Sequence, residues 1–135
     1  MLKEISLIMA IIASVIGFNF FIQNYLDKSS DEFVSELGNI SRKLLQEEAN
    51  VDYEGVKKEV NELENKWYGV ESVWMLIILH SELDKVDSGF KELEATLETE
   101  NSELSYVNAK KLEFLIESIT KKDLFELKNM IRMHI

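Results

Sequence analysis

The chain has 135 residues, enough for one modest domain, and contains no cysteine, so disulfides, thiolate metal sites, cysteine nucleophiles and lipid attachment through cysteine are excluded. Its formal net charge of −10 disfavours nucleic-acid binding and attraction to anionic lipid headgroups. Proline is absent and glycine occurs only five times, which favours helix almost everywhere. We expect an all-α fold: an N-terminal transmembrane helix followed by an antiparallel three-helix bundle with a short C-terminal helix.

The first element is an uncharged stretch over residues 5–22 that is rich in Ile, Phe and Ala. It approaches the ~20 residues that cross a ~30 Å hydrocarbon core. A cleaved secretory signal has a shorter apolar stretch and small residues at its cleavage site, and that pattern is missing after residue 19. We therefore favour an uncleaved signal-anchor over residues 1–27 that contacts the lipid bilayer through residues 5–22. A cleaved signal and a buried core helix are the alternatives.

Charges on the two sides of this stretch predict its orientation. The free amine and Lys3 precede it, whereas three acids and only Lys28 lie in the ten residues after it. The bias of basic residues toward the cytoplasm then places the N-terminus inside. We expect a single-pass protein of the cell membrane in which residues 28–135 form an acidic extracytoplasmic helical domain.

The next element carries a capping-box pattern at Ser29 and Glu32 and an apolar stripe that starts at Phe33. We expect a helix that begins near Ser29 and ends near Glu48. The alternative is one continuous helix over residues 2–48.

A sustained apolar seam follows, with cap candidates at Asn50 and Asp52. Its positions alternate between spacings of three and four residues: Tyr53, Val56, Val60, Leu63, Trp67, Val70, Trp74 and Ile77. After Ile77 the apolar positions change register, as in a coiled-coil stutter. We expect one long helix over residues 53–99, with a bend at Ser88-Gly89 as an option.

The remaining sequence predicts a helix that packs back on the long one. Asn101 or Ser102 caps it, and its apolar residues recur at helical spacing. Thr120 and Asp123 have the pattern of a new helix N-cap, and we expect the short terminal helix to begin there.

Two apolar features could carry a function. Val73–Leu79 is apolar throughout, which suits either the crowded centre of the bundle or a surface for association. Trp67 and Trp74 lie one heptad apart, where two indoles fill a core or line a ligand pocket. In both cases we favour packing.

His80 is the one candidate for site chemistry. Asp84 and Asp87 follow it at i+4 and i+7 on one stripe of a helix, whereas Glu82 lies about 200° round. His80 and Asp84 are weak candidates for metal ligands or for an oriented proton acceptor, and we favour a structural pair. We predict no catalytic residue, no cofactor and no metal site, and therefore no enzyme.

The residues Asn24-Tyr25-Leu26-Asp27-Lys28-Ser29-Ser30, then Trp67, Trp74 and His80-Ser81-Glu82-Leu83-Asp84, carry a resemblance over nearly the whole chain. The tail segments Leu115-Ile116-Glu117-Ser118-Ile119 and Leu127-Lys128-Asn129-Met130-Ile131 add to it. The chain resembles a bacterial family called domain of unknown function 4363, of spore-forming Gram-positive bacteria. This resemblance implies a single-pass membrane protein and supplies no mechanism.

The leading hypothesis is a membrane-tethered helical interaction or scaffold module, with a homo-oligomer or a membrane protein as partner and no nucleic acid. The alternative is an extracytoplasmic sensor domain that binds a small ligand or metal. The candidate interaction or ligand surface comprises Trp67, Trp74, Leu76, Ile78, His80, Glu82 and Asp84.

Overall fold

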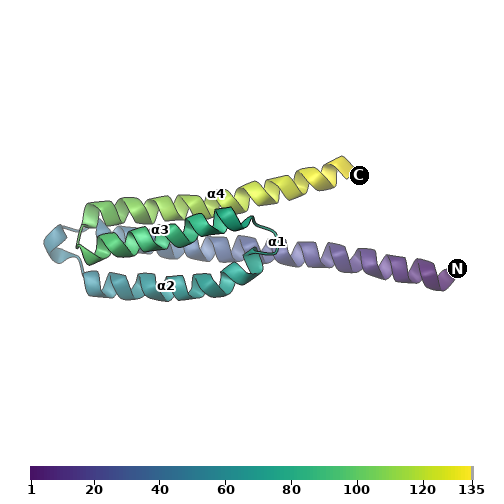
Figure 1. The fold of residues 1–135 in the computed structure, drawn as a ribbon, viewed down its shortest axis with the longest axis horizontal. Helices are drawn as coiled ribbons and strands as arrows, with labels where there is room; N and C mark the ends of the chain where they lie inside the picture. The colour runs from purple at the N-terminus through teal and green to yellow at the C-terminus, as the bar shows by residue number, and fades with distance from the viewer. Residues whose placement is uncertain (135) are drawn as a thin grey trace.

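The computed structural model describes the backbone of residues 1–134 and the side chains of residues 1–47 and 49–121. Within these residues the chain forms four α-helices and one turn of 3-10 helix (Figure 1). The elements are α1 (Leu2–Leu44), η1 (Glu48–Asn50), α2 (Tyr53–Trp74), α3 (His80–Glu98) and α4 (Ser102–His134). The all-α fold and the apolar N-terminal helix are confirmed.

Helix α1 has two halves with different surroundings. Its second half lies in a bundle with the other three helices, whereas its first half projects beyond α2 and α3 from one end of that bundle, and the end of α4 extends in the same direction (Figure 1). The first buried position is Ile22, and the last is Leu44. The expected start of a separate helix at Ser29 is wrong, because the Ser29 hydroxyl donates to the Tyr25 carbonyl at 2.7 Å within an unbroken helix.

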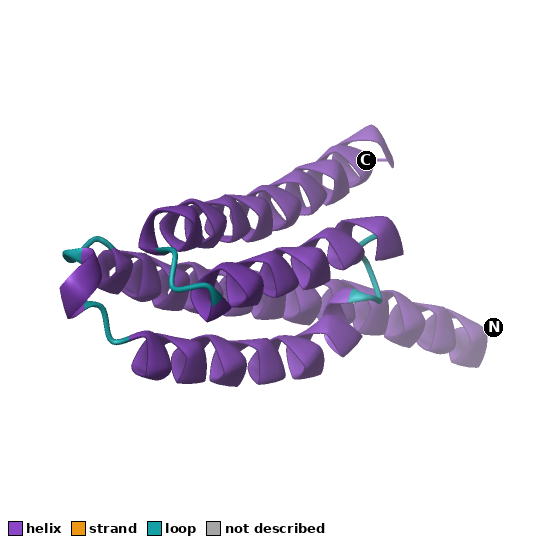
Figure 2. Cartoon of the chain, turned by 60° about the vertical axis from the view of Figure 1, so that its left-hand side comes forward, coloured by secondary structure: helices purple, strands orange, loops and turns teal. Residues whose placement is uncertain are grey.

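The four helices run alternately up and down, so that α1 packs against α2 and α4, and α3 packs against the same two helices (Figure 2). Buried apolar residues from all four helices form one continuous core. Most of the seam predicted for α2 is buried: Tyr53, Val56, Val60, Leu63, Trp67 and Trp74. The bundle is confirmed, and its packing follows from the predicted helical periodicity.

The predicted single helix over residues 53–99 is wrong, because the chain turns back at Met75–Leu79. The Trp74 carbonyl accepts from the amides of Ile77 and Ile78, and Leu79 is extended (φ −60°, ψ 137°) at the start of α3. The change of register after Ile77 therefore marks a reversal of the chain. The chain does not break at Ser88-Gly89, which lies within α3.

Gly89 instead lies directly against Leu112 of α4. A Cβ atom at Gly89 would lie 2.8 Å from the Cδ1 atom of Leu112, which is buried. This distance is shorter than a van der Waals contact. Leu112 can therefore pack against α3 here only because Gly89 has no side chain.

Helix α4 is continuous to His134, so the predicted cap at Thr120 and Asp123 is wrong. The Thr120 hydroxyl bonds to the Ile116 carbonyl of the preceding turn and to the Ser30 hydroxyl of α1 at 2.9 Å. Asp52 and Asn101 do cap α2 and α4: their side chains accept from the amides of Gly55 and Leu104. The side chain of Asp123 lies outside the described residues.

Candidate functional site

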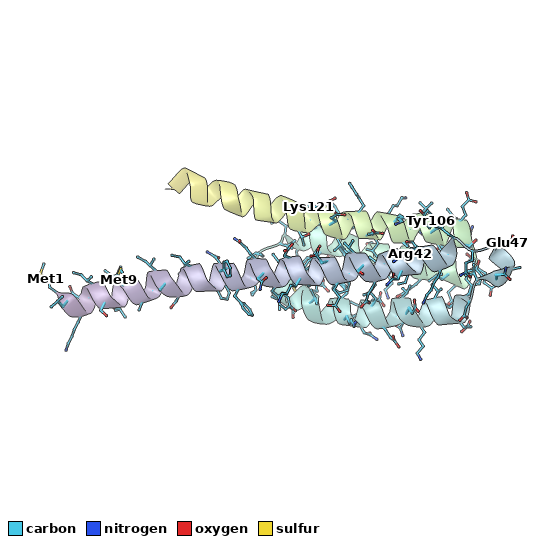
Figure 3. All side chains as sticks on the ribbon, turned by 180° about the vertical axis from the view of Figure 1, so that it is seen from behind. Met1, Met9, Arg42, Glu47, Tyr106 and Lys121 are labelled. Carbon is cyan, nitrogen blue, oxygen red and sulfur yellow. The ribbon has the colours of Figure 1, made fainter. Side chains whose placement is uncertain are left out.

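The first candidate is the free half of α1, residues 2–21, in which every large apolar side chain is exposed. Met1 and Met9 show the arrangement: side chains leave the helix in all directions and meet no other element (Figure 3). Only 6% of the most apolar 18-residue window is buried. A core helix of a soluble bundle would be mostly buried, so packing within this chain does not account for the apolar sequence. By length and composition, this helix can cross a membrane.

The second candidate is the predicted pair of tryptophans, which lies at the centre of the bundle. Trp67 and Trp74 are both 0% exposed. Their rings meet edge to face with centroids 5.1 Å apart, and Phe33 of α1 meets Trp67 in the same way at 5.9 Å. Such edge-to-face pairs stabilise a core beyond simple burial. The indoles are covered on all sides, so no ligand can reach them in this conformation.

Each indole also ties α2 to a neighbouring helix by a hydrogen bond. Trp74 Nε1 donates to the Ser29 hydroxyl of α1 at 3.0 Å, and Trp67 Nε1 donates to Asp87 Oδ1 of α3 at 2.6 Å. A buried indole N–H costs free energy unless it finds an acceptor, so both donors are satisfied. These two bonds position α2 relative to both of its neighbours.

Asp87 belongs to a group of acidic side chains between α2 and α3. Burial, reinforced by the nearby carboxylates of Asp87 and Asp84, raises the pKa of Glu71 above its ordinary value, and His80 opposes this rise. The imidazole and the two aspartates are those of the predicted stripe. The structure thus adds Glu71 to that stripe, from the facing helix.

A second acidic pair lies two turns further along the same interface. The Glu64 side chain is buried, and its Oε2 atom lies 3.4 Å from Lys91 Nζ; Glu94 Oε2 lies 3.5 Å from the same ammonium. Burial, followed by the hydrogen bond and charge of Glu64, raises the pKa of Glu94. The two carboxylates raise the pKa of Lys91, which balances one of the two negative charges.

Sequence reasoning missed Glu64 and Glu71. A signal for them exists, because they are seven residues apart on α2, and Asp87 and Glu94 are seven apart on α3. Two heptad-spaced acidic pairs on consecutive antiparallel helices can face each other across the interface. The prediction of one long helix hid this, because residues 64–71 and 87–94 face each other only after the turn at residues 75–79.

The rest of the predicted surface is divided by the turn. Ile78 is buried with the core, and Leu76 is exposed. His80 and Asp84 are exposed, and Glu82 pairs with Lys85 at 3.3 Å. In the part of the chain with described side chains, no hydrogen bond or ion pair joins His80 to Asp84, and no three His, Asp or Glu residues are placed to hold a metal ion.

Comparison with known proteins gives one match. The model of the family described as domain of unknown function (DUF4363) matches residues 20–130. No curated protein and no solved structure matches the chain. The matched range begins two residues before α1 enters the bundle at Ile22 and ends four residues before the end of α4.

Proposed function

The chain belongs to the DUF4363 family, and we propose that it is a membrane-tethered helical interaction module, anchored through residues 5–22 and holding its bundle against the bilayer surface. The observation that carries this proposal is the continuity of α1. The anchor and the first core helix are one element, so there is no linker between them. A module built in this way acts at a fixed distance from the membrane.

Retention of the apolar half as an anchor is part of the proposal. The ~20 residues needed to span a bilayer are present, and α1 enters the bundle at Ile22, so Ile22 is the one residue shared between the proposed span and the packed part. Tyr25, partly exposed just past this point, suits the membrane interface, where tyrosine is enriched.

We place the bundle outside the cytoplasm, as the charges around the anchor suggest. The chain has no cysteine, so a single introduced cysteine reports its location. In intact cells an impermeant maleimide should label Glu62→Cys in α2, which is exposed, and should label Leu2→Cys, which keeps Lys3, only after permeabilisation. The reverse pattern would invert the orientation. A mature chain that lacks the Leu2→Cys label altogether would show a cleaved signal.

Exposed apolar residues on α4 support the interaction role. Leu104, Val107 and Phe114 are exposed, and at 100° per residue they fall within an arc of about 80° on one face of the helix. Lys111 is exposed on the same face between Val107 and Phe114, so one basic side chain interrupts the apolar residues. Exposed apolar clusters bordered by polar residues are typical of protein contacts. This face offers a surface for a second copy of the chain or for another membrane protein.

Photo-crosslinking in native membranes tests this role. A photoreactive residue in place of Phe114 should give a discrete adduct, whereas the same residue at Glu62 should not. A chain that stays monomeric in the membrane and gives no adduct from Phe114 would count against an interaction module. The alternative of a ligand sensor has less support, because the two tryptophans that would line its pocket are 0% exposed.

A further inference from the structure

Among the side chains that the structure describes, the turn between α2 and α3 carries a cluster of exposed large apolar residues outside the free half of α1. Met75, Leu76 and Leu79 are 45%, 62% and 72% exposed, whereas Trp74 and Ile78 of the same segment are buried. Single exposed apolar residues are common on soluble proteins, but three within five residues on one turn form a patch. The two buried residues hold this patch rigidly on the bundle.

The patch lies at the end of the bundle from which the anchor leaves. Trp74 is bonded to Ser29 of α1, and because α2 is antiparallel to α1, the chain after Trp74 continues toward the free half. Ser29 is seven residues from Ile22, about 10 Å along the helix. The turn therefore lies beside the point at which α1 leaves the bundle (Figures 1 and 2).

The other end of the bundle has a different character. Its two connections, residues 45–52 and 99–101, expose mainly polar and charged side chains, with Leu45 as the one large apolar residue that is exposed among their described side chains. Glu47 lies at this far end (Figure 3). The apolar turn is thus a property of the anchored end and not of turns in this chain generally.

We propose that Met75, Leu76 and Leu79 insert into the headgroup region and outer hydrocarbon of the bilayer that residues 5–22 cross, as a second membrane contact. This inference rests on the proposed function, because it takes the bilayer position from the anchor. Since α1 is continuous, the distance from the anchor to the turn is fixed. Apolar side chains of interfacial elements reach about 5–10 Å into the boundary between headgroups and acyl chains, a depth that suits one turn of chain.

Charge at the anchored end is mixed, because Asp27, Asp31 and Glu32 of α1 lie there with Lys28, whereas the end of α4 has a basic excess. Thr120 pairs with Ser30, and the backbone of α4 runs on from there to His134 at the anchored end. The sequence after residue 120 contains four basic and two acidic residues, in a chain whose net charge is −10. Basic residues close to a membrane surface are attracted to anionic headgroups.

Nitroxide accessibility on the full chain tests the proposal. Single cysteines replace Leu79 at the turn, Gln46 at the far end and Ser14 in the anchor; all three positions are exposed, so the fold should persist, and circular dichroism checks it. The labelled chains are reconstituted in vesicles of equal parts phosphatidylcholine and phosphatidylglycerol. Broadening by oxygen reports lipid exposure, and broadening by a water-soluble nickel reagent reports water exposure.

We expect the Leu79 label to lose most of the nickel broadening seen at Gln46 and to gain oxygen broadening toward that seen at Ser14. If Leu79 and Gln46 behave alike while Ser14 reports lipid, the anchor stands and the second contact is refuted. If Leu79 is protected from both reagents, protein covers the turn and the lipid proposal fails. If Ser14 is itself open to the nickel reagent, the membrane tether proposed above is refuted as well.

Discussion

The interface between α2 and α3 and the interfaces made by α4 are built from different chemistry. Between α2 and α3 lie Glu64, Glu71, Asp87, Lys91 and Glu94, with two carboxyl pKa values raised. The polar contacts of α4 with its neighbours are neutral, as in the Ser30–Thr120 hydroxyl pair. Among the described side chains, no ion pair joins α4 to another helix. A change of pH should therefore affect the stability of the α2–α3 interface, whereas a change of side-chain volume should affect the interfaces of α4.

Trp67 is fully buried and donates to Asp87 of the acidic interface, so its removal should have the largest effect. Trp67→Ala removes the ring that packs between Phe33 and Trp74, and also the donor to Asp87. We expect the free energy of unfolding to fall by about 3–5 kcal/mol. Chemical denaturation of the full chain in detergent, followed by circular dichroism, measures it.

Tyr68→Ala serves as the matched control, because Tyr68 is the adjacent aromatic residue and is about half exposed. We expect it to cost about 1 kcal/mol or less. Equal losses for the two variants would show that Trp67 has no special place in the core.

Gly89→Ala tests shape at the contact of α3 with α4. The added methyl group would meet the terminal Cδ1 atom of Leu112 at 2.8 Å, and the surrounding core restricts the movement of this buried side chain. Overpacking of this kind costs about 1–3 kcal/mol, against a gain of about 1 kcal/mol in helix propensity, so we expect a net loss of stability. The control is Gly69→Ala in α2, where nothing lies within 4 Å and the variant should be more stable by about 0.5–1 kcal/mol. Thermal unfolding of both variants should shift in opposite directions, and a stabilised Gly89→Ala would contradict the close approach.

The hydroxyl pair between α1 and α4 should contribute a smaller amount. Ser30→Ala and Thr120→Ala each remove one partner of a buried hydrogen bond, and we expect each to cost about 1 kcal/mol. The double variant should cost less than the sum of the two single changes, because the shared bond is lost only once. Exact additivity in this double-mutant cycle would mean that the two hydroxyls do not interact.

A change of pH should act on α2 and α3 with the smallest effect. The pKa values of Glu71 and Glu94 are raised in the folded chain, so the folded state binds more protons than the unfolded state between the ordinary carboxyl pKa and the raised values. Stability from these groups should then rise as pH falls through that window and decline as pH rises through the folded pKa values.

The unfolding midpoint, measured across this window, checks the sign. Glu71→Gln together with Glu94→Gln should flatten the profile, whereas Ser30→Ala should lower it uniformly without changing its slope. A wild-type profile whose slope survives the double Gln variant would assign the pH dependence to other groups.

Much of the fold follows from the sequence, because apolar periodicity and local caps are set by residues close together in the chain. Most of the predicted seam of α2 is buried, and one of the two cap candidates at each helix start, Asp52 and Asn101, is observed. The cap pattern at Ser29 gave a wrong prediction of a helix start. A serine hydroxyl can donate to a carbonyl of the preceding turn within a helix as well as accept from an amide at a helix N-terminus. Tertiary packing on both sides of Ser29 decides between these options.

The acidic interface could not be predicted for a related reason. Glu64 and Glu94 are thirty positions apart and face each other only because the chain reverses at residues 75–79. Neither glycine nor proline marks that reversal, since the whole segment is apolar. A continuous helix and a tight hairpin of helices fit such a segment equally well until the other helices of the bundle are in place.

Because α1 is one unbroken helix, a tilt of its first half also tilts the bundle. Between Ile22 and Leu44 the helix rises about 33 Å. Spanning helices tilt by about 20° on average, and a tilt of that size about the membrane surface would move the far end of the bundle sideways by about 11 Å. With α1 anchored as proposed, changes in bilayer thickness that alter its tilt would displace, without any hinge, the surface that the bundle presents.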